Sequence, residues 1–427
     1  MPRIPDSPRT LWNFTGLMAD LTPDTVLRRI PSFTLRADPD GRITVEGPEG
    51  EAACGAAHGL AVLDVFAAAM TIGDAVALLR PRVRGAQDWI DLTNTIIELR
   101  QGGILVAEGE PRHAIDRQAR GFAAPEIHVS MLNDRARTDG FLAAIRETVK
   151  PGDVVIDAGT GTGVLAIAAA RAGARRVYAI EASSIGYLAD LMFQANGFSD
   201  RITLLEGRSA HVDLPEKADV LIGETIGSEP LREQVLETFL DLRSRCLKPG
   251  ARLVPEGLSV FGIPVEIPAA DLSPHTFTPE AAERWRDAYG MDFSPMAAVA
   301  ASPGQSFLAQ GAVARRWREL SDPIRLVEVD LRCHSDATIR TTSAASAKSV
   351  GIVNGLIIFF DLRVSPSVRL STAPASASEQ SNWRNPVEIL PAPWNVHPGD
   401  RIEVTYRYGV PGQRVEVRTA PRQPSTG

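Results

Sequence analysis

Residues 154–165 read VVIDAGTGTGVL, an apolar run that breaks into alternating glycines. Such a run suits a buried strand that turns into a helix over a small molecule, because glycines let the backbone approach a ligand and the helix N-terminus presents free N–H groups. Asp157, Gly159, Thr160 and Gly161 are therefore candidate binding residues. Expected strands and helices alternate outward from this stretch over residues 111–250, which predicts a parallel, doubly wound sheet.

An acidic residue follows the glycines at the spacing of nucleoside recognition. Glu181 lies 18 positions after Gly163 (181 − 163 = 18) and ends the predicted strand YAIE, where a carboxylate can accept both ribose hydroxyls. The glycines are not followed by a GK[ST] phosphate-binding motif. The pattern predicts a Rossmann-like site for an adenosyl cofactor, with a spacing that favours S-adenosylmethionine over NAD. Ala182, next to Glu181, is also a candidate cofactor-binding residue.

Residues 223–233, GETIGSEPLRE, contain two glutamates nine positions apart, Glu224 and Glu233 (233 − 224 = 9). They could simply be solvated, with Glu233 capping a helix expected over residues 231–247. Two carboxylates at the carboxyl end of a strand, beside a methyl donor, instead suggest a clamp for a planar cation such as a guanidinium. A protonated guanidinium is a poor nucleophile. A clamp that concentrates its charge on one nitrogen leaves another freer to attack a correctly aligned methyl group.

Composition narrows the class of protein. A chain of 427 residues exceeds one hydrophobic core, so two or three domains are expected. The net charge of −7 argues against a nucleic-acid partner. Three cysteines without a CxxC pair or suitably spaced histidines predict no metal site and a reduced cytoplasmic setting. No signal-like segment and no apolar run near the ~20 residues of a bilayer span occur, so no membrane partner is expected.

Residues 1–110 predict a separate small domain. Strands are expected over 33–37 and 42–47, helices over 60–79 (divided at Thr71) and 88–100, and a closing strand after Gly102-Gly103; a short helix is expected over 23–29. This winged-helix order resembles the PqqD-like peptide-recognition domain, which implies that a leader peptide adds as a strand to an exposed sheet edge. A packing or dimerisation domain is the alternative, and a DNA-binding winged helix is less favoured without a basic recognition helix.

Residues 251–418 change character to short strands with frequent proline and serine, which predicts a β-barrel or sandwich. A helical insertion is expected over 278–288. The segment TTSAASAKS at 341–349 is interpreted as a flexible hairpin loop, and residues 419–427 as a disordered tail.

Several motifs occur in a fixed order between residues 115 and 410. They are IHVSMLNDRART (127–138), the glycine stretch continued to YAIEAS (155–183), GETIGSEPLRE (223–233), WRDAYGMDFS (285–294), LSTAP (370–374) and SNW (381–383). Together they resemble the protein arginine methyltransferases. The resemblance implies an S-adenosylmethionine-binding sheet, then a β-barrel that carries a helical dimerisation arm at about 274–300, and hence a homodimer.

The resemblance also implies roles for single residues. Arg137 would pair with the carboxylate of the methyl donor, Glu181 would hold its ribose, and Met131 would line the site beside the transferred methyl group. Glu224 and Glu233 would grip the substrate guanidinium, with Glu224 also facing the donor. The other implied members of the site are Asp134, Asn382 and Trp383 on the catalytic side, and Ala182 and Ser209 on the cofactor side.

The sequence departs from the family pattern at four places. QARGF (118–122) replaces a helix with two tyrosines over the donor, and Asn382 replaces a histidine that pairs with an aspartate at the position of Asp134. An adenine-side glutamate corresponds to Ala210, and a tryptophan and a methionine of the glutamate loop correspond to Thr225 and Ile226. These changes leave the donor site and the clamp but put the accepted substrate and the rate in question.

The predicted function is S-adenosylmethionine-dependent N-methylation of an arginine guanidinium. The preferred substrate is a ribosomally made precursor peptide that the N-terminal domain recruits, as in the biosynthesis of ribosomally made, modified peptides. Methylation of a small molecule or another nucleophile is an alternative, and so is a pseudo-enzyme that binds donor or peptide without turnover. His128 and His211 are expected to be structural, because lone histidines near apolar faces usually are.

Overall fold

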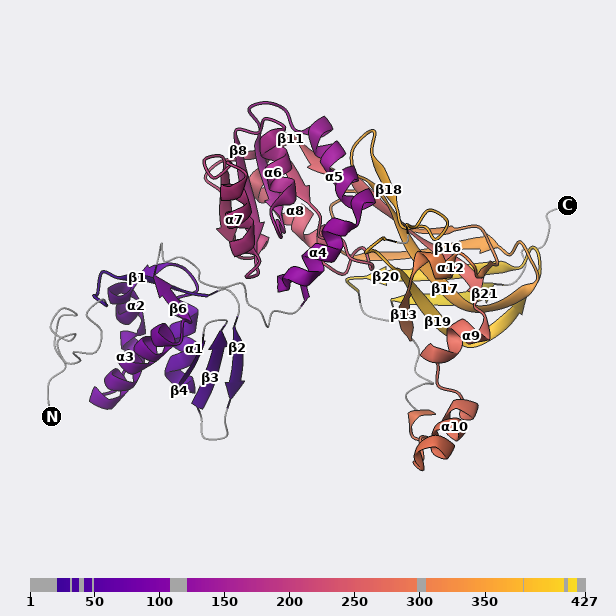
Figure 1. Cartoon of the computed structure of the whole chain (residues 1–427), viewed down its shortest axis with the longest axis horizontal. Coiled ribbons are helices and arrows are strands. Elements are labelled where there is room, and N and C mark those ends of the chain that lie inside the picture. The colour runs from indigo at the N-terminus through magenta and orange to yellow at the C-terminus, as the bar shows by residue number, and fades with distance from the viewer. Residues whose placement is uncertain are drawn as a thin grey trace. The chain divides into compact units, whose positions relative to one another are not determined.

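A computed structural model describes residues 21–30, 33–37, 42–47, 50–107, 121–297, 305–378, 380–410 and 414–420 (Figure 1). The chain divides into two compact units. One comprises Met1–His128 and Glu181–Met192, and the other comprises Val129–Ile180 and Phe193–Gly427. Among the described residues, no helix combines the length and apolar character that a bilayer crossing requires.

The N-terminal part of the first unit contains two three-stranded antiparallel sheets, ordered β2-β3-β4 and β5-β1-β6. Its elements are β1 (Val26–Arg29), β2 (Thr34–Ala37), β3 (Arg42–Gly47), β4 (Gly50–Gly55), α1 (Ala56–Val65), β5 (Met70–Thr71), α2 (Ile72–Leu79), η3 (Arg80–Arg82), α3 (Ala86–Gln101) and β6 (Leu105–Ala107). Leu92, Ile96 and Leu99 recur at helical spacing on α3. They are buried in one hydrophobic core together with residues of both sheets.

The helix break predicted at Thr71 is confirmed, because the Thr71 side chain accepts a hydrogen bond from the Asp74 N–H at 3.0 Å and caps α2. The helix predicted over residues 23–29 is wrong. Residues Val26–Arg29 form β1, which pairs with β5 on one side and β6 on the other. These partners lie more than forty positions away (70 − 27 = 43), so their pairing overrides the local pattern.

A five-stranded sheet, ordered β11-β10-β7-β8-β9, follows in the chain. Its strands are β7 (Val154–Ala158), β8 (Arg176–Glu181), β9 (Ile202–Glu206), β10 (Ala218–Gly223) and β11 (Leu247–Val254). The helices in this part of the sequence are η4 (Gly121–Ala123), α4 (Pro125–Asn133), α5 (Arg135–Thr148), α6 (Val164–Arg171), α7 (Gly186–Ala195), η5 (Ser209–His211) and α8 (Val235–Cys246).

The predicted parallel pairing of this sheet is confirmed. β7 pairs in parallel with both β8 and β10, and every residue of β7 is buried, as expected for a strand covered on both faces. The chain runs outward from β7 to β9 and then returns to the other side of β7 as β10. This reversal is a topological switch point, and ligands of such sheets bind outside the carboxyl ends of the strands that meet there.

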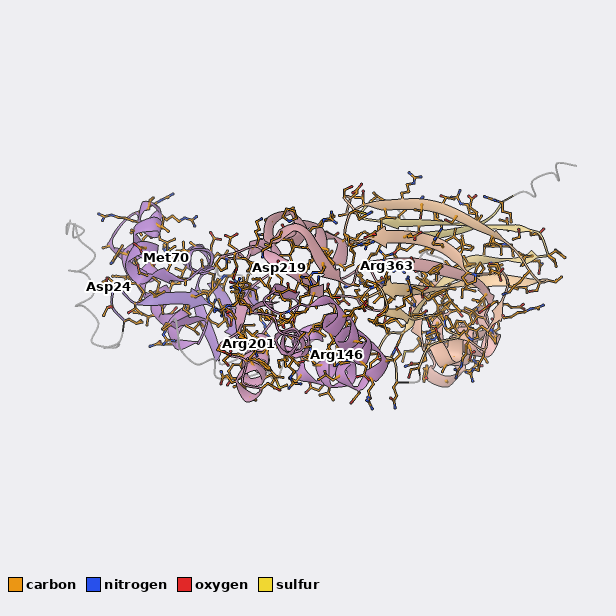
Figure 2. All side chains as sticks on the ribbon, turned by 90° about the horizontal axis from the view of Figure 1, so that it is seen from above. Asp24, Met70, Arg146, Arg201, Asp219 and Arg363 are labelled. Atoms are coloured by element: carbon orange, nitrogen blue, oxygen red, sulfur yellow. The ribbon has the colours of Figure 1, made fainter. Side chains whose placement is uncertain are left out.

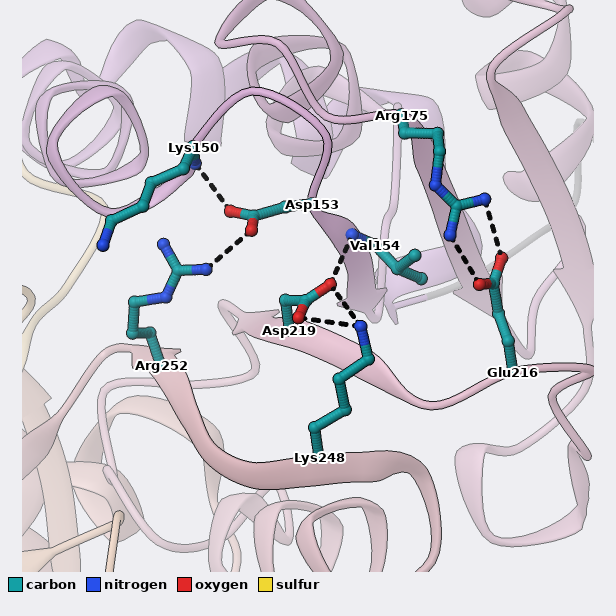
Figure 3. Close-up of polar contacts among 8 residues, drawn as sticks. All are labelled: Lys150, Asp153, Val154, Arg175, Glu216, Asp219, Lys248 and Arg252. Carbon is teal, nitrogen blue, oxygen red and sulfur yellow. Dashed lines mark hydrogen bonds and ion pairs between the residues drawn. The ribbon is translucent and has the colours of Figure 1, made fainter.

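Ion pairs stabilise the opposite, amino-terminal edge of the sheet (Figure 3). Asp219, at the start of β10, accepts hydrogen bonds from the Val154 N–H at 3.0 Å and the Lys248 ammonium at 2.9 Å. Asp153 pairs with Arg252 at 2.7 Å. These contacts join β11 to the starts of β7 and β10. Structural charge therefore lies at one edge of the sheet, away from the switch point.

The C-terminal region is antiparallel and barrel-like, as predicted. One sheet has the order β13-β19-β17-β12-β14, with β15 on β12 and β18 on β17, and a second has the order β16-β20-β21. The strands are β12 (Gly257–Glu266), β13 (Ser306–Ala309), β14 (Arg318–Glu319), β15 (Ile324–Asp330), β16 (Ile339–Ser346), β17 (Gly351–Arg363), β18 (Arg369–Ser371), β19 (Asn385–Val396), β20 (Arg401–Tyr408) and β21 (Val415–Ala420). Short helices are α9 (Ala269–Leu272), η6 (Ser273–His275) and α12 (Gly311–Ala314).

The helical insertion predicted over 278–288 is α10 (Pro279–Tyr289), which projects from the barrel-like sheets in Figure 1. Thr278 caps its N-terminus, and Gly290, with a φ of 68°, ends it in the left-handed conformation. The insertion therefore begins and ends at residue types that favour helix termini. Arg363, which Figure 2 labels, is the last residue of β17, a strand of the barrel-like sheet from which the chain leaves for α10.

One expectation for this region is wrong, and the start of another moves. Most of the supposed flexible loop at 341–349 belongs to strand β16, which pairs with β20 at eight successive positions from Ile339 to Ser346. The supposed tail at 419–427 begins inside β21, which reaches Ala420; residues 421–427 lie outside the described part. Small polar residues predicted loops here, but a long-range strand partner satisfies their backbone groups.

Gly163, which precedes α6, provides a test of the glycine loop. Its φ is +82°, and a Cβ atom there would lie 2.4 Å from Cε1 of Phe193. Gly163→Ala should therefore lose about 1 kcal/mol through left-handed strain and a further ~1–3 kcal/mol through overpacking. Gly152→Ala is the matched control, because its φ is +89° but nothing lies within 4 Å of the added atom. Equal losses of thermal stability in the two variants would contradict the packing argument.

Candidate functional site

The glycine loop and the glutamate loop lie at the switch point of the parallel sheet. The first follows β7 and the second follows β10, and these strands are neighbours in register, with Gly223 opposite Ala158. A Cβ atom on Gly159 would lie 2.7 Å from Cγ2 of Thr225. The two stretches singled out in the sequence are therefore in contact, and Gly159 has to be a glycine partly because Thr225 packs against it.

The glycine loop adopts a backbone conformation that requires glycine at two positions. Gly159 and Gly161 have φ values of +74° and +54°, which favour glycine. The N–H groups of Gly159 and Thr160 both donate to the Ile180 carbonyl at 2.9 Å. The Thr160 hydroxyl donates to the buried Asp157 carboxylate at 2.6 Å. This geometry fits a ligand that approaches the main chain closely.

Arg137, on α5, carries the positive charge of the site. Its side chain is 7% exposed, and Nη1 lies 3.4 Å from Oε2 of Glu224. Its guanidinium carbon lies 5.4 Å from the centre of the Trp383 ring, a cation–π contact. The site therefore already holds one guanidinium between a carboxylate and an aromatic face.

Burial raises the pKa of Glu224 from 4.5 to about 7. Arg137 opposes this shift, whereas the negative charges of Glu233 and Asp134 add to it. Burial also raises the pKa of Glu233, again against the effect of Arg137. The two glutamates thus interact with each other and with the same cation, which is the arrangement expected of a clamp.

Glu233 lies before α8 and not in its first turn, which corrects the helix predicted over 231–247. The helix begins at Val235, because Gln234 adopts the left-handed conformation with a φ of 61°. A Cβ atom on Gly227 would lie 2.0 Å from Oε1 of Glu233. The absence of a side chain at position 227 therefore makes room for this carboxylate, a role that sequence reasoning missed although a glycine between two acids was a possible signal.

The segment 381–384, which precedes β19, holds the glutamate loop from the barrel side. The Trp383 indole N–H donates to the Ile226 carbonyl at 2.7 Å, and the Arg384 N–H donates to the Ser228 hydroxyl at 3.0 Å. The Trp383 ring also packs edge-on against Phe360, with centroids 5.1 Å apart. Trp383 thus fixes the loop and covers Arg137 at once.

Asp134 keeps a partner in the segment 381–384 although Asn382 replaces the family's histidine. Its Oδ2 accepts a hydrogen bond from the Asn382 backbone N–H at 2.8 Å, and its Oδ1 accepts one from the Arg137 N–H at 3.3 Å as the cap of α5. The Asn382 side chain accepts a bond from the Ser130 hydroxyl at 3.0 Å. Ser130 lies on α4, and Met131, the next residue of that helix, is half-buried.

The other predicted residues are placed as follows. Glu181 ends β8, and its carboxylate accepts bonds from the Ser183 N–H and hydroxyl at 2.9 and 2.8 Å; Ala182 beside it is exposed. The Ser209 carbonyl, in η5, accepts a bond from Arg245 at 2.8 Å. Residues 118–120 lie outside the described part. The buried His128 ring lies 2.8 Å from the Phe122 carbonyl, in keeping with a structural role. Within the described residues, no group of three side chains could hold a metal ion.

Comparisons with known proteins show which family this chain resembles. The family model of ribosomal protein L11 methyltransferase matches residues 134–258, and that of the arginine methyltransferase oligomerization subdomain matches residues 269–411. Protein arginine N-methyltransferase 1 of Saccharomyces cerevisiae is 32% identical over 288 residues, which cover 65% of this chain and 78% of that protein. Probable protein arginine N-methyltransferase 6 of Arabidopsis thaliana is 39% identical over 181 residues, 42% of this chain but only 40% of that protein.

Solved structures show the same fold. The Trypanosoma brucei PRMT1 enzyme-prozyme complex with AdoHcy aligns with a TM-score of 0.61 at 25% identity, covering 70% of this chain and 94% of that one. Protein arginine methyltransferase 10 of Arabidopsis thaliana aligns with a TM-score of 0.54 at 25% identity, covering 65% and 86%. Fold and loops define an S-adenosylmethionine-dependent methyltransferase. The chain belongs to the protein arginine N-methyltransferase family.

The raised pKa of Glu224 predicts how stability depends on pH. Between pH 4.5 and about 7 the folded protein keeps a proton on Glu224 that the unfolded chain has lost. The contribution of this proton to the free energy of unfolding is therefore complete below pH 4.5 and is lost as the pH rises through 7. The whole contribution is about 3 kcal/mol. Glu224→Gln should remove this part of the slope.

Thermal unfolding of wild type and Glu224→Gln between pH 5 and pH 8 measures the effect. The melting temperature of the variant should rise relative to wild type as the pH increases. A constant difference across this range would show that Glu224 titrates at an ordinary pKa.

Proposed function

We propose that this protein transfers a methyl group from S-adenosylmethionine to a guanidinium nitrogen of an arginine side chain in a peptide. One observation carries the proposal. Glu224 and Glu233 share a buried site in which Glu224 already contacts a guanidinium, that of Arg137, at 3.4 Å. Both carboxylates are short of compensating charge, because burial raises the pKa of each despite Arg137. A second guanidinium, from the substrate, would supply that charge.

The clamp would activate one nitrogen of the substrate guanidinium. Carboxylates that accept hydrogen bonds from two guanidinium nitrogens draw positive charge toward those nitrogens and leave electron density on the third. Burial strengthens the effect, since charges interact more strongly away from water. The nitrogen–carbon bond then forms as the carbon–sulfur bond breaks, and the methylated guanidinium releases one proton.

The donor side rests on the glycine loop. Asp157, Gly159, Thr160 and Gly161 would receive the donor, which supplies an electrophilic methyl group on a sulfonium centre. Glu181 directly follows Ile180, which pairs with Ala158 at the end of β7. Glu181, Ala182 and Ser209 would then hold the ribose and adenine, and Arg137 the carboxylate. Met131 would lie beside the methyl group. These roles follow from the family resemblance.

We also propose that the N-terminal region recruits the substrate as a winged-helix, PqqD-like domain. Both family matches begin at or after residue 134 and leave this region to another role. β2 is the outer strand of the sheet β2-β3-β4, and all four of its residues are exposed. A leader segment of a ribosomally made precursor peptide could pair with such an edge through main-chain hydrogen bonds.

Self-association through the arm is a third part of the proposal. Around the end of α10 the apolar side chains of Tyr289, Met291 and Met296 are 63%, 61% and 46% exposed. Apolar groups gathered on a projecting segment favour burial against another molecule. A second copy of the chain is the proposed partner, which gives a homodimer.

Replacing either glutamate of the clamp tests the transfer. Glu233→Gln and Glu224→Gln should each lower kcat/KM for an arginine peptide about 10²–10³-fold, because each removes a charge that stabilises the transition state. Glu328→Gln, an exposed acid of the barrel, is the control. Transfer is measured with labelled donor, and donor affinity of Glu233→Gln by calorimetry.

The same assay separates the alternatives. Donor binding by wild type without transfer to any peptide would identify a binding protein, and transfer to a small amine alone would identify another nucleophile. Unchanged rates in both glutamine variants would reject the clamp.

Hydrogen exchange on the intact chain tests the recruitment. A precursor peptide that adds to the edge of β2 should slow amide exchange in residues Thr34–Ala37, because edge amides become hydrogen-bonded. The same peptide without its leader segment is the control. Slowed exchange confined to the glutamate loop, with none in β2, would show that the N-terminal region does not recruit the leader.

A further inference from the structure

The glutamate loop contains a third acid, Glu229, which the clamp does not use. Its Oε2 forms an ion pair with Nη1 of Arg414, and Nη2 of the same arginine pairs with Oε1 of Glu388 on β19. Arg414 is 29% exposed, Glu229 20% and Glu388 9%. One guanidinium from the segment before β21 thus bridges the glutamate loop to the barrel.

This bridge is partly buried and places one guanidinium between two carboxylates. Burial raises the pKa of Glu388, and Arg414 opposes that shift. Burial works against the charge on Arg414, but Glu388 and Glu229 outweigh it and raise the pKa of Arg414. Arg232, which lies 3.7 Å from Glu229, is 79% exposed and so interacts weakly. Arg414 is therefore the main cation for Glu229.

Glu229 lies between the part of the loop that segment 381–384 holds and the clamp residue Glu233. Trp383 and Arg384 hold the loop at residues 226 and 228, and Gly227 packs against the Glu233 carboxylate. Glu229 is the next residue after these contacts, four positions before Glu233. A shift of the loop at Glu229 would carry Gly227 and Glu233 with it, because Gly227 and Glu233 are only six positions apart (233 − 227 = 6).

We propose that Arg414 is a positioning residue for the substrate clamp, which it serves by tying Glu229 to Glu388. It has two effects. It fixes the C-terminal half of the glutamate loop, and it occupies the third carboxylate so that the substrate guanidinium meets only Glu224 and Glu233. The inference rests on the proposed function for its effect on substrate, but the placement of the loop can be measured without any activity.

The test compares Arg414→Met with Arg363→Met. Arg363 also bridges two acids of the barrel, Glu256 at 3.1 Å and Asp330 at 3.1 Å, and is 28% exposed, but these partners lie outside the glutamate loop. Arg414→Lys is the conservative variant, since a lysine keeps the positive charge but lacks the planar fork that contacts both acids through separate nitrogens.

Arg414→Met should raise KM for an arginine peptide by about tenfold or more and leave the Kd of S-adenosylhomocysteine within about twofold, with Arg414→Lys between it and wild type. Amide exchange in residues 226–234 should be faster in Arg414→Met than in Arg363→Met at matched melting temperatures. Unchanged loop exchange in folded Arg414→Met, or equal changes in Arg363→Met, would overturn the proposal. If wild type methylates no arginine peptide, the proposed function fails, while the exchange result still decides the role of Arg414.

Discussion

The buried pairing of Arg137 with Glu224 is the interaction on which the site depends. A carboxylate that leaves water without a cation becomes protonated, and the raised pKa of Glu224 shows how near this site comes to that limit. Several neighbours act to keep Arg137 in place. Asp134 caps the helix that carries it, and Trp383 covers its face while bonding the glutamate loop. The charge balance and the loop geometry are thus set by the same few contacts.

Local patterns predicted much of this architecture. The apolar run before Asp157 and the glycines after it determine a buried strand and an open turn within a dozen residues, so no distant partner is needed to recognise them. The same holds for Thr71, whose side chain caps a helix that begins at the next residue. Glu224 and Glu233 could be paired from spacing alone because both follow one strand. Their convergence on Arg137 agrees with the interpretation as a clamp.

Contacts between distant segments could not be predicted in this way. β1 and β16 are strands because of partners far along the chain. Gln234 delays the start of the expected helix by adopting a left-handed conformation, which a glutamine side chain does not predict. The replacement of the family's histidine by Asn382 suggested that Asp134 had lost a partner. The main-chain N–H of Asn382 donates a hydrogen bond to Asp134 instead, and this N–H does not depend on the side chain. Arg414 and Glu229 are 185 positions apart (414 − 229 = 185), and nothing in either neighbourhood marks them as a pair.

The glutamate loop is held by segment 381–384 and by Arg414, which are synthesised long after the loop itself. The strands that place the glycine loop are complete once β11 has been made, at Val254. The loop that holds Glu224 and Glu233 receives its supports only when Trp383, Arg384 and finally Arg414 have been added. A chain emerging from the ribosome therefore contains the strands around the glycine loop well before it contains the residues that support the glutamate loop.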